Sequence, residues 1–97
     1  MMQRNEMYFD LTRKAKLLVA DYINKKNEDI HEITPITLGE ININWFSKTV
    51  NNWSAFLSTN IPDGVYYEVG YNGFTNSSYL YAYQKFDSVS IDETERN

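Results

Sequence analysis

The hydrophobic pattern of this chain changes its period once, near residue 40, and that change restricts the fold more than any other feature. Residues 4–26 carry apolar side chains at spacings of three and four, as an amphipathic helix does. From Ile41 onward, apolar and polar residues alternate, which is typical of strands with one buried face. One helix followed by several strands predicts an α+β fold.

The helix is predicted over about residues 4–26, followed by a connection over 27–40. Lys25 and Lys26 suit the negative end of the helix dipole. Within the connection, "TLGE" from Thr37 has the pattern of a capping box and predicts one short helical turn, which Gly39 keeps from extending. The apolar stripe of the helix is expected to run through Met7, Leu11, Ala15, Leu18 and Tyr22, and it is widened by Phe9, Val19 and Ile23.

The sheet is assigned to residues 41–91, and a charged tail over 92–97 is expected to fray. Four strands are predicted, over residues 41–48, 53–59, 65–71 and 79–86. The polar turns "NN", "PDG" and "NG" separate them, and connections this short favour antiparallel neighbours. The prediction is therefore a single domain over residues 1–97, with one helix packed on a four-stranded antiparallel meander.

Both tryptophans lie in one short stretch, "WFSKTVNNW", which predicts a hairpin. In that hairpin Trp45 and Trp53 are expected to flank the turn as a cross-strand aromatic pair, which stabilises a sheet. Core packing at the hairpin end is the favoured interpretation, and a stacking platform for a ligand is the alternative.

Alternation divides the sheet residues between two faces, although a slip of one residue would exchange them. The face expected to meet the helix holds Ile41, Ile43, Trp45, Leu57, Val65, Tyr67, Val69, Leu80, Ala82 and Phe86. The opposite face is expected to hold six aromatic residues with three charged ones. They are Phe46, Phe56, Tyr66, Tyr79, Tyr81 and Tyr83, with Lys48, Glu68 and Lys85.

A single helix covers only one face of a sheet, so the second aromatic face needs an explanation. Tyrosines on an outer face often stay half-exposed with wet hydroxyls, which is one interpretation. The other is a contact surface, because aromatic residues with few charges mark interface cores. The candidate partner-binding residues are Phe46, Lys48, Phe56, Tyr66, Glu68, Tyr79, Tyr81 and Tyr83.

Composition and motifs narrow the remaining classes. The chain has no cysteine, and its opening residues "MMQRNEMYFD" contain no apolar run of signal-peptide length. No stretch reaches the about 18 apolar residues of a spanning helix. These features predict a cytoplasmic protein without membrane contact.

No catalytic, cofactor or metal motif is found. His31 is the only histidine and lies in an acidic connection without the spacing of a metal site. Gly70 and Gly73 match no phosphate-binding loop, and the carboxylates Asp63 and Glu68 are expected to aid solubility. The sequence therefore predicts no enzyme and no cofactor, while an unrecognised activity stays open.

Charge is divided unevenly along the chain, whose formal net charge is −4. Residues 1–27 hold six Lys/Arg and three acids, whereas residues 28–97 hold three Lys/Arg and ten acids. An acidic sheet repels phosphates, which disfavours free nucleic acid as a partner. Contact of phosphate with Arg13, Lys14 and Lys16 on the helix is a minority hypothesis.

The stretches "WFSKTVNNWSAFLST", "PDGVYYEVGYNG" and "YLYAYQKF" together resemble an uncharacterised family of small proteins encoded by phages and mobile elements of Gram-positive bacteria. The resemblance begins in the helix at "KAKLLVADYIN" and extends to the last strand. It implies a biological setting, a bacterial host cell, and no particular activity.

Small acidic proteins of such elements frequently bind a host protein, and some inhibit CRISPR nucleases. The resemblance therefore implies a protein that binds a bacterial protein or protein–nucleic-acid complex. The first alternative is a homo-oligomer, such as a homodimer, that buries the aromatic face against its copy. The second is a nucleic-acid binder or enzyme of unrecognised type.

Overall fold

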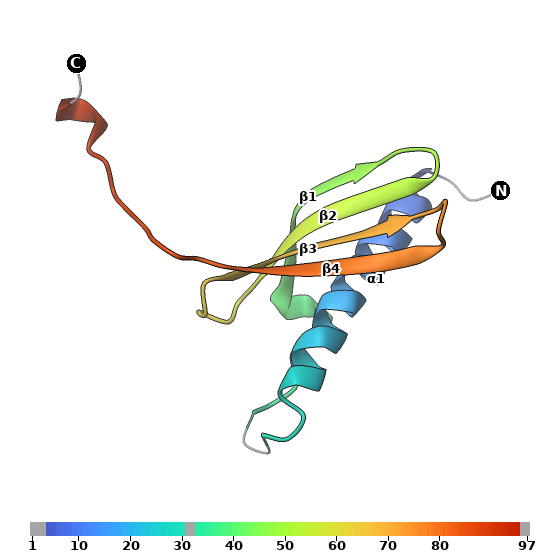
Figure 1. Ribbon diagram of the computed structural model, residues 1–97, viewed down its shortest axis with the longest axis horizontal. Helices are drawn as coiled ribbons and strands as arrows, with labels where there is room; N and C mark the ends of the chain where they lie inside the picture. Colours follow the sequence, from blue (N-terminus) through green and yellow to red (C-terminus); the bar gives the residue numbers. More distant parts are fainter. Residues whose placement is uncertain (1–3, 31–32, 96–97) are drawn as a thin grey trace.

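The computed structural model describes residues 4–30 and 33–95, and it has one helix lying on one face of a four-stranded sheet (Figure 1). The strand order is β1-β2-β3-β4 with every neighbouring pair antiparallel, so the predicted α+β meander is confirmed. The elements are α1 (Arg4–Lys26), η1 (Leu38–Glu40), β1 (Ile41–Lys48), β2 (Asn52–Thr59), β3 (Val65–Asn72), β4 (Ser77–Gln84) and η2 (Glu93–Glu95).

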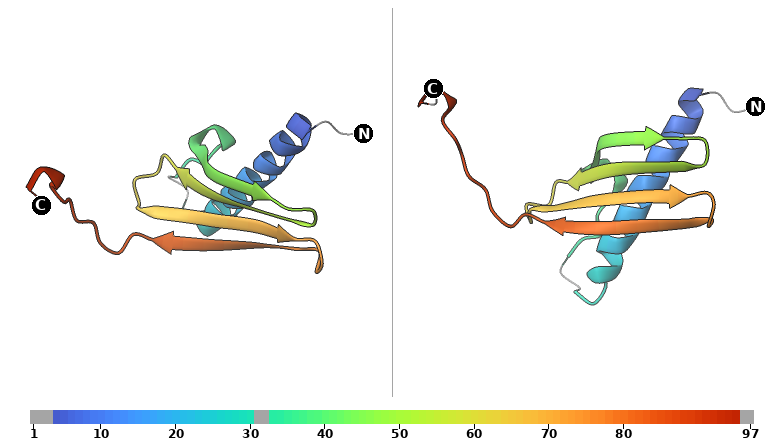
Figure 2. Two further views of the ribbon diagram at one scale, coloured as in Figure 1. Left: turned by 90° about the horizontal axis from the view of Figure 1, so that it is seen from above. Right: turned by 45° about the horizontal axis from the view of Figure 1, so that its top comes forward.

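The helix runs across the strands on the inner face of the sheet (Figure 2). Its contact line passes through Ala15, Val19 and Ile23, each at most 5% exposed. The predicted stripe is confirmed at these three positions, whereas Met7, Phe9 and Tyr22 are exposed and Leu11 and Leu18 are only partly buried. Ala15, Val19 and Ile23 follow one another at spacings of four, so they share one side of the helix.

The core lies between α1 and β1–β3. The helix packs most extensively on β1 and β3, and less on the edge strand β4. The sheet residues that belong to the core alternate with more exposed residues along β2 and β3, as the period of two requires. They are Ile41, Trp53, Ala55, Leu57, Tyr67 and Val69.

The connection between helix and sheet is fixed by two side chains. Asn24 donates to the carbonyl of Ile36 through Nδ2 (3.2 Å) and accepts from its backbone N–H through Oδ1 (2.8 Å), which seats the buried Ile36. The Glu40 side chain accepts hydrogen bonds from the backbone N–H and hydroxyl of Thr37. The short helical turn predicted from "TLGE" is therefore confirmed as η1.

The predicted assignment of β1 residues to the two faces of the sheet is wrong beyond Asn44. The register pairs Ile43 with Leu57 but Trp45 with Phe56, so Asn44 is an extra residue and forms a β-bulge. A bulge puts two residues of one strand opposite one residue of its partner, which exchanges the two faces beyond it. Trp45 therefore lies on the outer face, whereas Phe46 and Lys48 lie on the helix side.

The expected pairing of the two tryptophans is wrong for the same reason. Trp53 is opposite Lys48, is 5% exposed, and stacks on Phe46 with 6.2 Å between ring centroids. Trp45 is 49% exposed on the other side of the sheet. The core packing expected of this pair is thus performed by Phe46 and Trp53.

The last strand begins and ends two residues earlier than predicted, at Ser77 and Gln84. Asn76 has φ 51°, a left-handed conformation that asparagine tolerates, and it closes the turn early enough for Ser77 to pair with Asn72. The turn between β2 and β3 also contains a residue in the left-handed conformation, Gly64, with φ 71°.

Residues 85–92 form an extended C-terminal segment that leaves the sheet beyond β4 (Figures 1 and 2). The predicted sheet region, 41–91, is therefore longer than the strands themselves. Phe86 was expected on the helix face and is 100% exposed, because the strand ends before it. Lys85 keeps one backbone hydrogen bond, from its N–H to the carbonyl of Gly64 at 2.8 Å.

Candidate partner-binding face

The face of the sheet turned away from α1 carries a continuous aromatic surface. The registers place Trp45, Phe56, Glu68 and Tyr81 in one row across all four strands, and they pair Tyr66 with Tyr83 in a neighbouring row. We call the following residues the aromatic face: Trp45, Phe56, Tyr66, Tyr81 and Tyr83.

Each member of the aromatic face is at least 40% exposed. Trp45 and Phe56 are in contact, with ring centroids 5.7 Å apart and ring planes 57° apart. These two rings carry no hydroxyl, and only Trp45 has a polar N–H. Half-exposed rings of this kind favour a contact surface over ordinary outer-face tyrosines.

Glu68 is the charged residue at the centre of this surface. Its two carboxylate oxygens accept one hydrogen bond each, from the hydroxyl of Tyr79 at 3.2 Å and from that of Tyr83 at 3.0 Å. Tyr81 lies directly opposite Glu68 on β4, between the two donors. The tyrosine hydroxyls thus hold the carboxylate in a fixed position.

The pKa values of both donor tyrosines are raised. For Tyr79 the main cause is burial, followed by the hydrogen bond to Glu68 and its negative charge. For Tyr83 the main cause of the raised pKa is its own hydrogen bond to Glu68. Both hydroxyls therefore stay protonated, and remain donors to Glu68, over the whole neutral range.

Tyr79 covers a gap in the sheet surface. It pairs with Gly70, and a Cβ added to that glycine would lie 2.5 Å from the Tyr79 ring and hydroxyl. The Tyr79 ring also lies 5.0 Å from that of Tyr81. An aromatic ring laid over a cross-strand glycine stabilises the sheet and directs the hydroxyl toward Glu68.

Beside Glu68, the aromatic face contains an open hollow of about 460 Å³. Phe56, Tyr66 and Tyr83 line it, together with Asn44 at the bulge and Leu57. The bulge therefore shapes the hollow as well as turning Trp45 outward. A shallow apolar hollow suits an inserted side chain of another protein.

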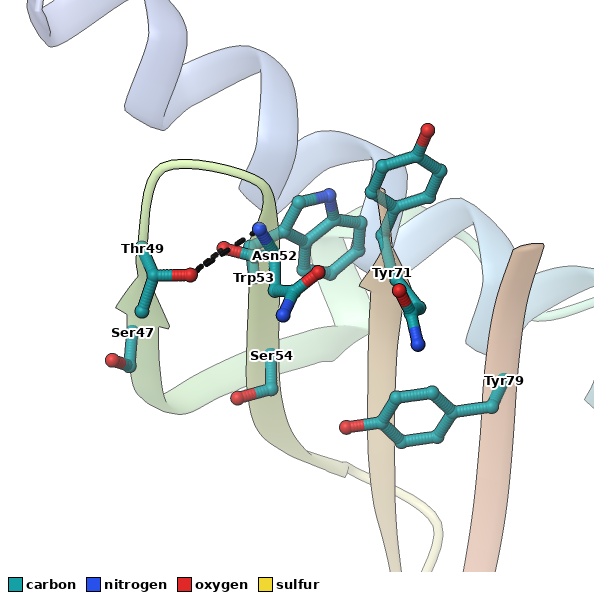
Figure 3. Close-up of a pocket in the computed structure, with 8 residues that line it drawn as sticks. Ser47, Thr49, Asn52, Trp53, Ser54, Tyr71 and Tyr79 are labelled. Atoms are coloured by element: carbon teal, nitrogen blue, oxygen red, sulfur yellow. Dashed lines mark hydrogen bonds between the residues drawn. The ribbon is translucent and has the colours of Figure 1, made fainter. Parts of the chain in front are cut away.

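A second hollow, of about 210 Å³, lies toward the β1–β2 and β3–β4 turns and is polar (Figure 3). Ser47 and Ser54 face each other across β1 and β2, and the ring of Tyr79 reaches toward them from β4 (Figure 3). The backbone of Asn52 is fixed by hydrogen bonds with Thr49. The outer face thus has an aromatic half and a hydroxyl-rich half.

The predicted site residues are only partly brought together. Phe56, Tyr66, Glu68, Tyr79, Tyr81 and Tyr83 share the outer face. Phe46 contacts Tyr8 of α1 at 5.1 Å between centroids, and Lys48 lines a helix-side hollow with Met7, so neither belongs to this face. Trp45 was missed because the bulge that exposes it leaves no unambiguous mark in the sequence.

The outer-facing strand residues that the structure describes include Glu68 but no lysine or arginine. A surface that binds single-stranded nucleic acid combines stacking aromatics with a cationic groove for phosphates. The described strand residues thus supply the rings to this face but no lysine or arginine. The chemistry of the aromatic face therefore suits a protein surface better than a nucleic acid.

The basic residues of the helix lie on the other side of the molecule. Lys14 places its Nζ 5.2 Å from the centroid of the Tyr71 ring, a cation–π contact. Arg13 and Lys16 line a groove beside η1 and β1. Three cations on the helix are thus divided between two environments.

Within residues 4–30 and 33–95 no three His, Asp or Glu side chains are grouped as metal ligands. His31 lies outside the described residues. In the same described ranges, no helix is long and apolar enough to cross a membrane. The partner-binding assignment of the outer face stays a prediction.

Comparison with known proteins gives one match. A family model described as "Family of unknown function (DUF6275)" matches residues 12–93. No curated protein and no solved structure matches the chain. The matched segment includes most of α1, the whole sheet and the C-terminal segment after β4.

Proposed function

The chain belongs to the family of unknown function DUF6275, and from its own surface we propose that it is a non-enzymatic module that binds another protein through the aromatic face. The observation that carries the proposal is the exposure of Trp45 and Phe56 beside three half-exposed tyrosines. Aromatic side chains of this kind are the usual energetic centres of protein interfaces.

Glu68 indicates the chemistry of the partner. A carboxylate held by two hydroxyls and bordered by aromatic rings is a favourable environment for a cation, because ring faces and carboxylate both attract it. We expect an arginine or lysine of the partner to face Glu68, while an apolar side chain enters the hollow beside Phe56. The net charge of −4 supports a basic partner surface by speeding encounter.

The proposal extends to the biological setting. The resemblance to small phage and mobile-element proteins supports a bacterial host protein, or a protein–nucleic-acid complex, as the partner. A defence nuclease is the specific candidate, because its nucleic-acid groove is basic and suits an acidic ligand. In this setting the protein inhibits the nuclease by occupying that groove, in the cytoplasm of the host.

The test compares two variants of the same kind in different places. Trp45→Ala with Tyr81→Ala removes two rings from the aromatic face. Phe74→Ala removes a ring that is 79% exposed in the β3–β4 turn, and it serves as the matched control. Tagged proteins are used to capture partners from nuclease-treated bacterial lysate, and the captured protein is then purified and titrated against all three forms.

We expect one host complex that binds the unaltered protein and the Phe74→Ala control alike, and that binds the double variant at least about tenfold more weakly. Glu68→Gln should weaken the same complex and reduce its dependence on salt. Equal binding by all forms would overturn the proposal. Self-association lost only in the double variant would instead support the homo-oligomer that buries this face.

A further inference from the structure

The C-terminal arm, defined as residues 85–92, has a composition that does not fit a spacer. Flexible spacers are rich in glycine and serine, whereas this arm contains no glycine and three large apolar residues. Phe86 is 100% exposed, Val89 75% and Ile91 62%. Beyond Lys85 the arm makes local hydrogen bonds, such as that from the Ser88 N–H to the Asp87 side chain.

The match to the family model covers residues 12–93 and so includes the whole arm. An extended segment that carries three exposed apolar side chains needs a surface on which to bury them. Figures 1 and 2 show the arm leaving the sheet edge and pointing away from the rest of the molecule.

A groove of matching chemistry lies at the opposite sheet edge. It measures about 400 Å³ and separates α1 from η1 and β1. Two rings at its border are exposed, Tyr8 at 52% and Phe9 at 65%. We call it the basic groove, and its lining includes Tyr8, Phe9, Arg13, Lys16, Leu38 and Ile43.

Charge and hydrophobicity both fit the arm to this groove. Among the residues that the structure describes, its lining includes Arg13 and Lys16 and no carboxylate. The arm carries Asp87 and Asp92 among its apolar residues. With Lys85 at its start the arm has two acids and one base, so an apolar and net acidic extended segment complements an apolar and basic groove.

The arm starts at β4 and the groove adjoins β1, so they lie at opposite edges of the sheet. Three strand spacings separate those edges, about 14 Å. To reach its own groove the arm has to reverse direction and pass the helix that covers the inner face. An extended segment of this length spans about 26 Å and reaches a neighbouring molecule directly.

We propose that two copies of this chain exchange their C-terminal arms, each arm lying in the basic groove of the other copy. The arrangement is reciprocal, so it closes as a symmetric dimer. It uses the helix side and leaves the aromatic face free. The proposal therefore stands or falls independently of the function assigned to that face.

The experiment uses two full-length variants that each disable one half of the contact. The arm variant carries Phe86→Ser, Val89→Ser and Ile91→Ser, all at exposed positions. The groove variant carries Arg13→Glu and Lys16→Glu. Lys25→Glu with Lys26→Glu makes the same charge change at the end of α1 and is the control, and circular dichroism checks that every form is folded.

Light scattering over a dilution series should show a dimer for the unaltered protein and the control. Each disabled variant should dissociate at a concentration at least about tenfold higher. When the two are mixed, the intact arm of the groove variant meets the intact groove of the arm variant. Native mass spectrometry should then detect a mixed dimer with one arm–groove contact.

Three results would overturn the proposal. The first is that the unaltered protein stays monomeric throughout the dilution series. This result counts against the proposal even if the arm lies in the groove of its own chain. The second is a dimer that survives the arm substitutions. The third is a pair of monomeric variants that do not associate when mixed, because that places the arm on a surface other than the groove.

Discussion

Trp45 lies directly across from Phe56 on the outer face of the sheet, with 5.7 Å between their ring centroids. Simple alternation from Ile41 puts Trp45 on the helix side, and the extra residue Asn44 reverses it. This one insertion separates the two tryptophans of the chain into different environments, one half-exposed and one buried.

The separation of the tryptophans is measurable by fluorescence. In a Trp53→Phe variant only Trp45 emits, and in Trp45→Phe only Trp53 emits. Because Trp45 is 49% exposed and Trp53 5%, acrylamide should quench the first variant more strongly and its emission should lie further to the red. Equal quenching in the two variants would contradict the bulge.

Gly70 and Tyr79 should be coupled in stability. A methyl group on Gly70 meets the Tyr79 ring, so Gly70→Ala must displace that ring and break its hydrogen bond to Glu68. We expect Gly70→Ala to lower the free energy of unfolding by about 1–3 kcal/mol.

A double-mutant cycle tests this cause. In a Tyr79→Ala background the obstacle is gone, and Gly70→Ala should cost nothing or stabilise, since alanine restricts the unfolded chain more than glycine does. Urea unfolding of the four proteins gives the coupling. An unchanged cost in both backgrounds would assign the effect to the backbone instead of the ring.

Asn24, near the end of α1, should be the polar residue on which the position of the connection depends most. Its side chain both donates to and accepts from the backbone of Ile36, so Asn24→Ala leaves two partly buried backbone groups without their partner. We expect a loss of about 1–3 kcal/mol, and a smaller loss for Asn24→Asp, which keeps the acceptor. Asn42→Ala, at an exposed position of β1, is the control and should change stability by less than about 0.5 kcal/mol.

Stability should fall at alkaline pH because of the raised tyrosine pKa values. An unfolded tyrosine loses its proton near pH 10, while the folded state keeps protons on Tyr67, Tyr79 and Tyr83 to a higher pH. The folded state then binds more protons than the unfolded state, so the free energy of unfolding decreases as the pH rises through this window.

Glu68→Gln provides the control for that titration. It should lower the pKa of Tyr83, whose shift has the hydrogen bond to Glu68 as its main cause, and lower that of Tyr79 in part. The pKa of Tyr67 should not move, because its causes are burial, Asp63 and Tyr22. Carbon-13 NMR of labelled tyrosines resolves these positions, and a uniform shift of all three would disprove the assignment.

The helix, the four strands and their order could be predicted because each has a clear hydrophobic period and polar turns between elements. The two-residue displacement of β4 could not, since Ser77 and Ser78 resemble a loop and become strand only by pairing with Asn72 and Tyr71. Pairing of this kind overrides the low strand propensity of serine.

The outer face could be predicted wherever alternation is unbroken, which holds for Phe56, Tyr66 and the β4 tyrosines. It could not be predicted for Phe46 and Lys48, which come after the bulge. The adjacent rings in "WF" had to point to opposite faces, but residue type alone does not decide which one meets the helix. That choice is made by Phe46 packing between Tyr8 and Trp53.

The bulge at Asn44 absorbs one residue of β1, so the two faces of the strand do not follow from counting residues alone. In a substitution scan along Ile41–Lys48, positions that tolerate substitution should alternate with positions that do not. This alternation should shift by one residue at Asn44. A relative lacking the single codon for Asn44 would have no residue to bulge, so its tryptophan would follow Ile43 directly and still lie on the outer face. A relative that pairs Asn44 instead of bulging it would display Phe46 and Lys48 where this protein displays Trp45. Alignments should therefore be read together with the strand register at this position, because the same residues can present different surfaces of β1.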